Sequence, residues 1–106
     1  METNLRQLAR ILTDDGWTCT LRVADGRPLL RVVDARVPVL GETIAVALVP
    51  DAGGGPAAWF RSSTGVLLGP CDDPGRAATG VRVLLGPWVA RALGAGRRSG
   101  TGLRNE

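Results

Sequence analysis

The side chains that could do chemistry are cysteines, hydroxyls and carboxylates, and their spacing favours no reaction. Cys19 and Cys71 lie far apart in the chain and match no paired-cysteine or cysteine–histidine metal spacing. Neither has a neighbouring base that would activate a thiolate. Cys19 falls on the apolar side of a predicted strand, which favours a buried structural thiol. A disulfide between the two cysteines stays open from the sequence.

The hydroxyl-rich segment 62–65 reads Ser-Ser-Thr-Gly and could suggest a phosphate loop or a serine nucleophile. It lacks the spacing and the lysine of a phosphate loop, and the chain contains no histidine or lysine to serve as a base. We interpret these residues as turn formers. The acidic pairs at 14–15 and 72–73 have no third ligand at metal spacing. We therefore predict a chain that is not an enzyme and uses no cofactor or metal.

Length and composition predict one globular domain. The chain has 106 residues, of which 44% are hydrophobic and 22% charged, which is ordinary for a folded protein. The net charge is +3, and Arg97, Arg98 and Arg104 against Glu106 supply +2 of it, so the body over 1–93 is nearly neutral. The sequence shows no signal-peptide pattern and no membrane-spanning apolar run, so we expect a cytoplasmic protein.

Hydrophobic periodicity predicts a helix followed by a run of strands. The expected elements are a helix over 4–15 capped by Thr3 or Asn4 and ended by Gly16, strands over 17–23 and 29–34 joined by an Asp25-Gly26 turn, a loop over 35–42, and a strand over 43–49. A flexible Gly/Pro loop then leads into a tight hairpin over 59–71, whose turn contains Thr64 and Gly65.

The Asp73-Pro74 pair predicts the start of a closing helix. Its apolar stripe is Ala77, Val81, Leu84, Leu85, Trp88 and Leu93, and Pro87 should kink or break the helix near Gly86. We predict an α+β fold of a single domain over 1–93, in the order α-β-β-β-β-β-α. Its antiparallel meander carries both helices on one face, and a disordered basic tail covers 94–106.

A partner-binding surface is predicted on the sheet. The strand over 43–49 is apolar on both faces, so Ala45, Ala47 and Val49 need a cover on the side away from the core. Trp59 and Arg61 alternate onto one side of the hairpin, followed by Ser63, and an exposed Trp beside Arg is typical of a binding hot spot. The alternative is that Trp59 packs against a helix or under a loop, with Arg61 covering it.

These features together predict a non-enzymatic protein-binding module, chaperone-like or regulatory, which forms a homodimer and has no membrane partner. The alternative is a nucleic-acid-binding domain similar in outline to double-stranded RNA-binding domains. That class needs a basic helix face, and the closing helix offers only the well-separated Arg76, Arg82 and Arg91.

The segments 16–17, 38–42, 59–68 and 70–72 resemble those of a group of small uncharacterised actinobacterial proteins. The hairpin sequence Trp-Phe-Arg-Ser-Ser-Thr-Gly is the specific part of this resemblance. The group has no assigned activity, so the resemblance implies no functional residues. The helix–meander–helix layout is similar to the type III secretion chaperone-like fold, which implies a dimer that binds protein segments.

Overall fold

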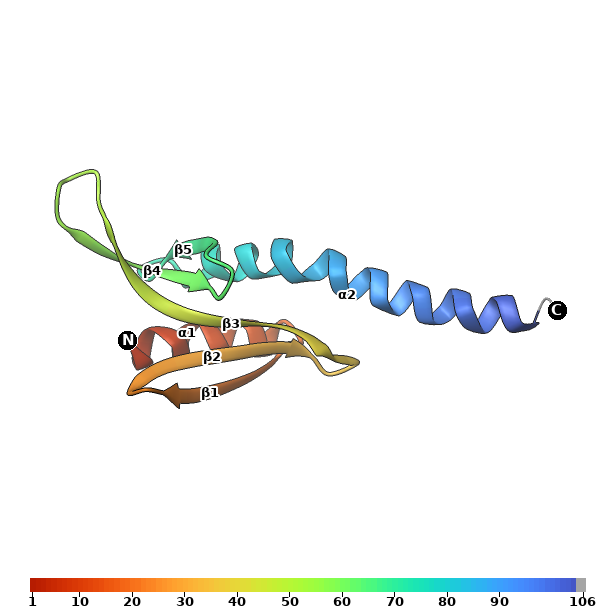
Figure 1. Ribbon diagram of the computed structural model, residues 1–106. Coiled ribbons are helices and arrows are strands. Elements are labelled where there is room, and N and C mark those ends of the chain that lie inside the picture. Colours follow the sequence, from red (N-terminus) through yellow and green to blue (C-terminus); the bar gives the residue numbers. More distant parts are fainter. Residues whose placement is uncertain (105–106) are drawn as a thin grey trace.

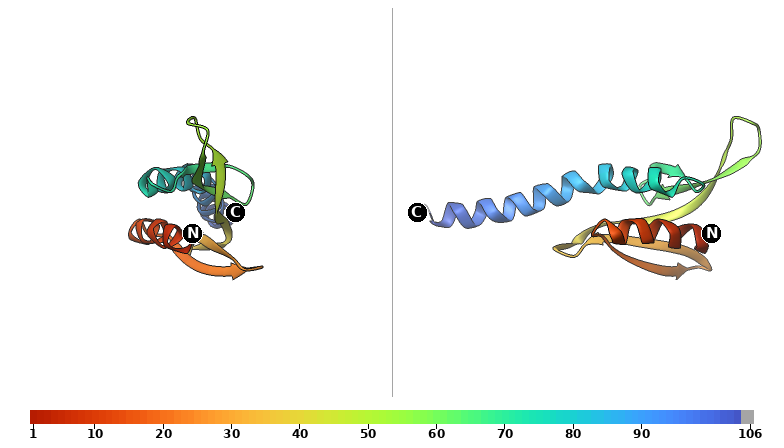
Figure 2. Two further views of the ribbon diagram at one scale, coloured as in Figure 1. Left: turned by 90° about the vertical axis from the view of Figure 1, so that its left-hand side faces the viewer. Right: turned by 180° about the vertical axis from the view of Figure 1, so that it is seen from behind.

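Five antiparallel strands form one sheet, and two helices pack on the same face of it (Figures 1 and 2). The computed structural model describes the backbone of residues 1–104 and the side chains of residues 1–94. The elements are α1 (Glu2–Asp14), β1 (Thr18–Ala24), β2 (Arg27–Asp34), β3 (Val37–Pro50), β4 (Pro56–Ser62), β5 (Leu67–Pro70) and α2 (Pro74–Arg104). Each strand pairs with the next one in the chain, so the predicted α+β class, element order and meander are confirmed.

The core lies between the sheet and the two helices. Its largest buried side chain is Phe60 on β4, and its members come from α1, from the central strands and from the first half of α2. They include Leu5, Leu8, Leu12, Leu30, Val32, Ile44, Phe60, Ala77, Ala78, Val81 and Leu85. Burying an aliphatic or aromatic side chain of this size stabilises a fold by about 1.5–3 kcal/mol.

Several local predictions are confirmed. The Asp25-Gly26 turn joins β1 to β2 with both residues at positive φ (53° and 75°), as a two-residue hairpin of type I′ requires. Gly16 follows α1 at φ 99°. The Asp73 carboxylate accepts a 3.1 Å hydrogen bond from the Arg76 backbone N–H, so it caps α2.

Two predictions about element ends are wrong. No side chain caps α1, which begins at Glu2, one or two residues before the predicted caps Thr3 and Asn4. The predicted loop over 35–42 is mostly strand, because β3 begins at Val37 after a two-residue turn. We expected Pro38 and Gly41 to end the strand. Gly41 is instead required by a close approach, since a Cβ there would lie 2.5 Å from a methyl carbon of Val33.

Helix α2 is continuous through Pro87, so it does not break near Gly86, and a kink there stays a prediction. It lies tightly against β5, because a Cβ on Gly80 would lie 2.7 Å from the Leu68 carbonyl oxygen and a Cβ on Gly69 would lie 2.8 Å from the Ala77 nitrogen. The helical backbone extends to Arg104, beyond the sheet (Figure 2). The side chains of residues 95–106 lie outside the described part of the chain, so a disordered tail over 94–106 stays a prediction.

Candidate protein-binding surfaces

The sheet divides where β3 leaves β2. Pairing between these strands ends at Leu30 and Ile44, whereas β3 continues to Pro50 paired only with β4 (Figure 1). We call this division, formed by residues 27–29 of β2 and 45–50 of β3, the β2/β3 fork. A cleft of about 710 Å³ lies in it. Four of the six residues predicted from the sequence as partner-binding line that cleft: Ala45, Ala47, Arg61 and Ser63.

The backbone of β3 in the fork has a free edge. The Thr43 carbonyl accepts a 2.8 Å hydrogen bond from the Ser63 N–H, and the Asp51 N–H donates a 2.7 Å hydrogen bond to the Gly55 carbonyl. Odd-numbered residues of this part of β3 therefore point their backbone groups at β4. The N–H and C=O groups of Val46 and Leu48 point the opposite way, where no strand of the described chain pairs with them.

Side chains alternate across the two faces of the fork. Leu30 is buried on the helix side, so Leu29 and Arg27 lie on the open side of β2. Ala45 pairs with Arg61 across β3 and β4, on that same open side. The cleft thus has Arg27 and Arg61 on its open side. Neither forms an ion pair with a carboxylate of residues 1–94, and no acidic residue lines the cleft.

Ser63 is already engaged within the protein. Its backbone N–H donates a 3.0 Å hydrogen bond to a carboxylate oxygen of the buried Glu42, and its hydroxyl donates to the same oxygen. The predicted turn also forms, since the Ser62 hydroxyl contacts that of Thr64 and accepts a 3.0 Å hydrogen bond from the Val66 N–H. These bonds fix the end of β4 and so the position of Arg61.

Trp59 and Val49 stand apart from the fork cleft. Trp59 is half-buried opposite Ala47 and Pro70, and the Arg76 guanidinium lies 5.6 Å from its ring centroid. Arg76 of α2, and not the neighbouring Arg61, therefore stacks on this ring. Val49 is half-buried farther along β3, opposite Ala57. The structure therefore joins four of the six predicted residues and separates these two.

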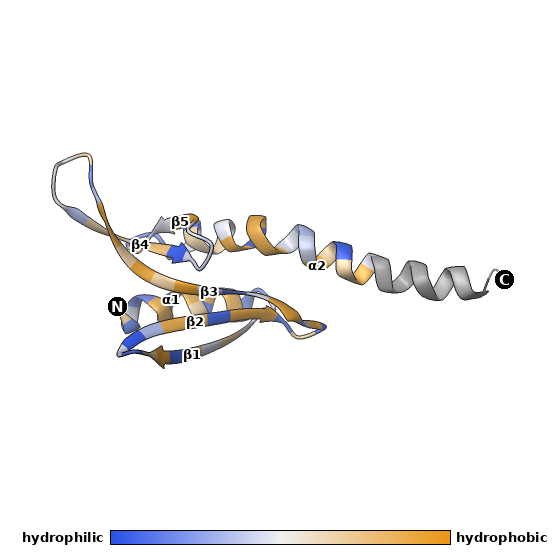
Figure 3. Cartoon of the chain, in the orientation of Figure 1, coloured by the Kyte–Doolittle hydropathy of each residue, from blue (hydrophilic) through white to orange (hydrophobic). Residues whose placement is uncertain are grey.

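A second surface lies between β5 and α2, which we call the α2/β5 patch. It surrounds a cleft of about 480 Å³ whose lining contains no charged residue: Val66, Leu67, Leu68, Thr79, Gly80, Val83, Leu84, Pro87 and Trp88. Four of its large apolar side chains are well exposed: Val66 and Leu67 at 45%, Val83 at 71% and Trp88 at 56%. Figure 3 shows hydrophobic residues along this part of α2 and along β3.

Trp88 is exposed, which contradicts the prediction from the sequence. The sequence placed it on the buried stripe of the closing helix, but more than half of its surface is exposed. The helix runs over the end of the short strand β5, and Leu85 and Val89 take the inward positions instead. The sequence held only part of the signal for the patch. Val83 falls outside the stripe of Val81 and Leu85, but Trp88, seven residues after Val81, falls on it.

The described arginines of α2 all contact other residues of the chain. The Arg82 guanidinium donates a 2.6 Å hydrogen bond to the Asp15 carboxylate, which lowers the pKa of Asp15. Arg76 stacks on Trp59, and the Arg91 guanidinium lies 5.4 Å from the Trp88 ring centroid. These contacts leave little of a basic helix face for duplex RNA, which weighs against the nucleic-acid alternative.

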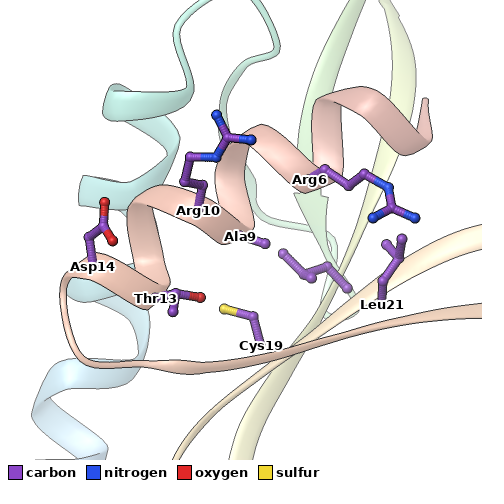
Figure 4. A pocket seen from close by; sticks show the side chains of 8 residues that line it. Arg6, Ala9, Arg10, Thr13, Asp14, Cys19 and Leu21 are labelled. Carbon is purple, nitrogen blue, oxygen red and sulfur yellow. The ribbon is translucent and has the colours of Figure 1, made fainter.

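The cysteines are two free thiols. Cys19 lies in a cleft of about 400 Å³ between α1 and β1, where its sulfur points toward Thr13 and the guanidinium groups of Arg6 and Arg10 extend from the helix (Figure 4). Burial raises the pKa of the Cys19 thiol, and burial likewise raises that of Cys71. Both thiols are therefore held in the protonated form, which is a poor nucleophile.

One residue of each acidic pair makes a structural contact. Asp73 caps α2, and Asp15 bonds to Arg82 and accepts from the Trp17 indole N–H at 3.3 Å. The strongest carboxylate shift is at Asp34, where hydrogen bonds from Arg36 lower the pKa to about 2. Among the described residues, no group of three His, Cys, Asp or Glu side chains is placed to hold a metal ion.

Comparisons with known proteins give no relative for this chain, since no family model, curated protein or solved structure matches it. The resemblances drawn from the hairpin sequence and from the layout therefore stay predictions. Within the described residues, neither helix combines the length and the apolarity that crossing a membrane requires.

Proposed function

We propose that this chain is a non-enzymatic protein-binding module, a chaperone-like or regulatory accessory protein that works as a homodimer in the cytoplasm. The observation that carries the proposal is the α2/β5 patch, with its uncharged lining and its exposed Val66, Leu67, Val83 and Trp88. Homodimer interfaces are more apolar and poorer in charge than ordinary surface. The two free thiols fit a reducing compartment.

The patch is better suited to a protein than to a small molecule. Its cleft is shallow and its lining lacks the convergent polar groups that orient a small ligand. Trp88 supplies the large aromatic contact typical of an interface centre, and Arg91 stacked on its ring adds a polar rim. The β2/β3 fork, which shares no lining residue with the patch, is a second surface that a partner could contact.

The test is the mass in solution, measured by size-exclusion chromatography with light scattering. We expect twice the 11.1 kDa chain mass for the natural sequence and a single chain mass for Val83→Glu. A glutamate at Val83 would bury an unpaired charge in the interface. The matched control is Val39→Glu, since Val39 is 85% exposed in the hairpin between β2 and β3 and lies outside the patch.

Circular dichroism separates loss of the dimer from loss of the fold. Because Val83 is largely exposed, the Val83→Glu chain should keep its helical and strand signal. A natural chain that stays monomeric at high micromolar concentration would overturn the homodimer. So would a dimer that Val39→Glu dissociates and Val83→Glu leaves intact.

A further inference from the structure

We propose that the β2/β3 fork binds an extended, acidic segment of a partner protein as an added strand on β3. The inference deepens the proposed protein-binding function and rests on it, because it names the kind of segment bound and the edge that binds it. Three observations support it: the direction of the backbone N–H and C=O groups of β3, the shape of the fork and the charges beside the fork.

The backbone of β3 supplies the first observation. Beyond Ile44, the N–H and C=O groups of Val46 and Leu48 point away from β4 into the fork, and no strand of the described chain pairs with them. A free edge of this kind pairs with another extended chain through main-chain hydrogen bonds. The segment 45–50 is long enough for a bound strand of about six residues.

The shape of the fork selects a single strand. Arg27, Pro28 and Leu29 of β2 line the same cleft as residues 45–48 of β3. The start of β2 therefore flanks the free edge of β3. A second copy of this chain would bring its own β4 alongside its β3, so it would need room for an additional strand between β3 and β2. A lone extended segment needs no such space.

The charges beside the fork define the side chains of the segment. Arg27 and Arg61 lie on the open side of the cleft with no acidic residue among its lining. On the helix side, the cleft is lined by Met1, by the half-buried Val46, by Leu48, which is 63% exposed, and by the buried Ser62, so three of these four side chains are apolar. Side chains of a strand alternate between faces, so the segment should alternate acidic residues, which face the arginines, with apolar ones, which cover Val46 and Leu48.

The probe is an end-blocked hexapeptide of alternating glutamate and valine, titrated into the full chain by fluorescence anisotropy or calorimetry. We expect saturable binding by this peptide and none by the matching lysine–valine peptide. Methylating the backbone nitrogens on the pairing edge of the probe removes its donors and should abolish binding.

The chain offers a matched pair of variants. Substituting Arg27→Gln together with Arg61→Gln should weaken binding about tenfold, because two partly solvated charge contacts are lost. The control is Arg22→Gln, an exposed arginine of β1 that lies outside the cleft. All of these arginines are exposed, so thermal melts should be unchanged within a few degrees.

Four outcomes would overturn the inference, three with the peptide probes and one with a variant chain. The glutamate–valine probe could fail to bind, it could bind no better than the lysine probe, or the N-methylated probe could bind equally well. A Leu48→Pro chain that loses its dimer would also overturn it, since the fork would then be an interface between copies. The three peptide results leave the light-scattering test of the α2/β5 patch untouched, so failure of the probe and failure of the dimer are distinguishable. Loss of the dimer in Leu48→Pro would in addition move the interface between copies from the patch to the fork.

Discussion

The α2/β5 patch and the β2/β3 fork are both apolar openings on one small domain, and they differ in charge and in backbone. The patch has an uncharged lining, and α2 packs closely on the face of its strand β5. The fork has Arg27 and Arg61 at its side and unpaired backbone groups at Val46 and Leu48.

This difference teaches what each surface can recognise. An uncharged side-chain surface gains from burial alone, which suits a second copy of the same surface. An edge with free donors and acceptors gains from main-chain pairing, and the neighbouring charges then choose among the extended segments that could pair. Two surfaces of similar hydrophobicity therefore support different partners.

The largest expected effect is at Trp88. Trp88→Ala should weaken the homodimer about 30-fold, since a central interface tryptophan contributes about 2 kcal/mol. The melting temperature of the diluted monomer should fall little, because 56% of the side chain is exposed in the single chain. Analytical ultracentrifugation measures the first quantity and calorimetry the second. A variant that loses its fold while unassembled would place Trp88 back in the core.

Salt should separate the two surfaces. Raising ionic strength from about 0.05 to about 0.5 M shortens the screening length to less than half and should weaken binding of the acidic probe several-fold. The dimer should hold or tighten slightly over the same range, because no charged residue lines the cleft at its centre. Titrations and light scattering at each salt concentration provide the comparison. Parallel salt curves for the two equilibria would remove the distinction drawn between them.

The smallest effect is expected at Trp59. Trp59 lies outside both clefts, and the Arg76 guanidinium stacks on its ring. Trp59→Ala should therefore change the dissociation constants of the probe and of the dimer by less than about twofold. The substitution should instead lower the free energy of unfolding, by about 1 kcal/mol for the lost stacking contact and by a further amount for the buried part of the ring. Urea denaturation measures it. A tenfold loss of probe binding would restore the sequence-based site, in which Trp59 and Arg61 act together.

Much of the fold could be predicted from local patterns. The stripe of Leu5, Leu8 and Leu12 specified the helix that packs on the sheet, and the Asp25-Gly26 turn and the Asp73 cap were read from short-range chemistry. The length of β3 could not be predicted in this way. Pro38 and Gly41 normally end strands, and only their neighbours across the sheet explain why they are tolerated.

The candidate site was predicted in part. Alternation grouped Ala45 with Ala47 and Arg61 with Ser63, because residues two apart share a face. The pairing of β3 with β4 then brings the two groups to one cleft. The contribution of Arg27 was missed, since it depends on where β2 and β3 separate. The sequence also took Trp88 for a core residue, because a helical stripe records spacing and does not record where the neighbouring strand ends.

The sequence by itself therefore determined the elements, the side of each strand that is apolar and the scarcity of catalytic side chains. The tertiary structure alone decided which apolar residues stay uncovered. That choice depends on the short β5 lying under a long α2 and on β3 continuing past the end of its pairing with β2. Both are differences in length and direction between packed elements, which the periodicity of either element alone does not record. Local interactions fix the period of a segment, whereas exposure is set by what packs against it.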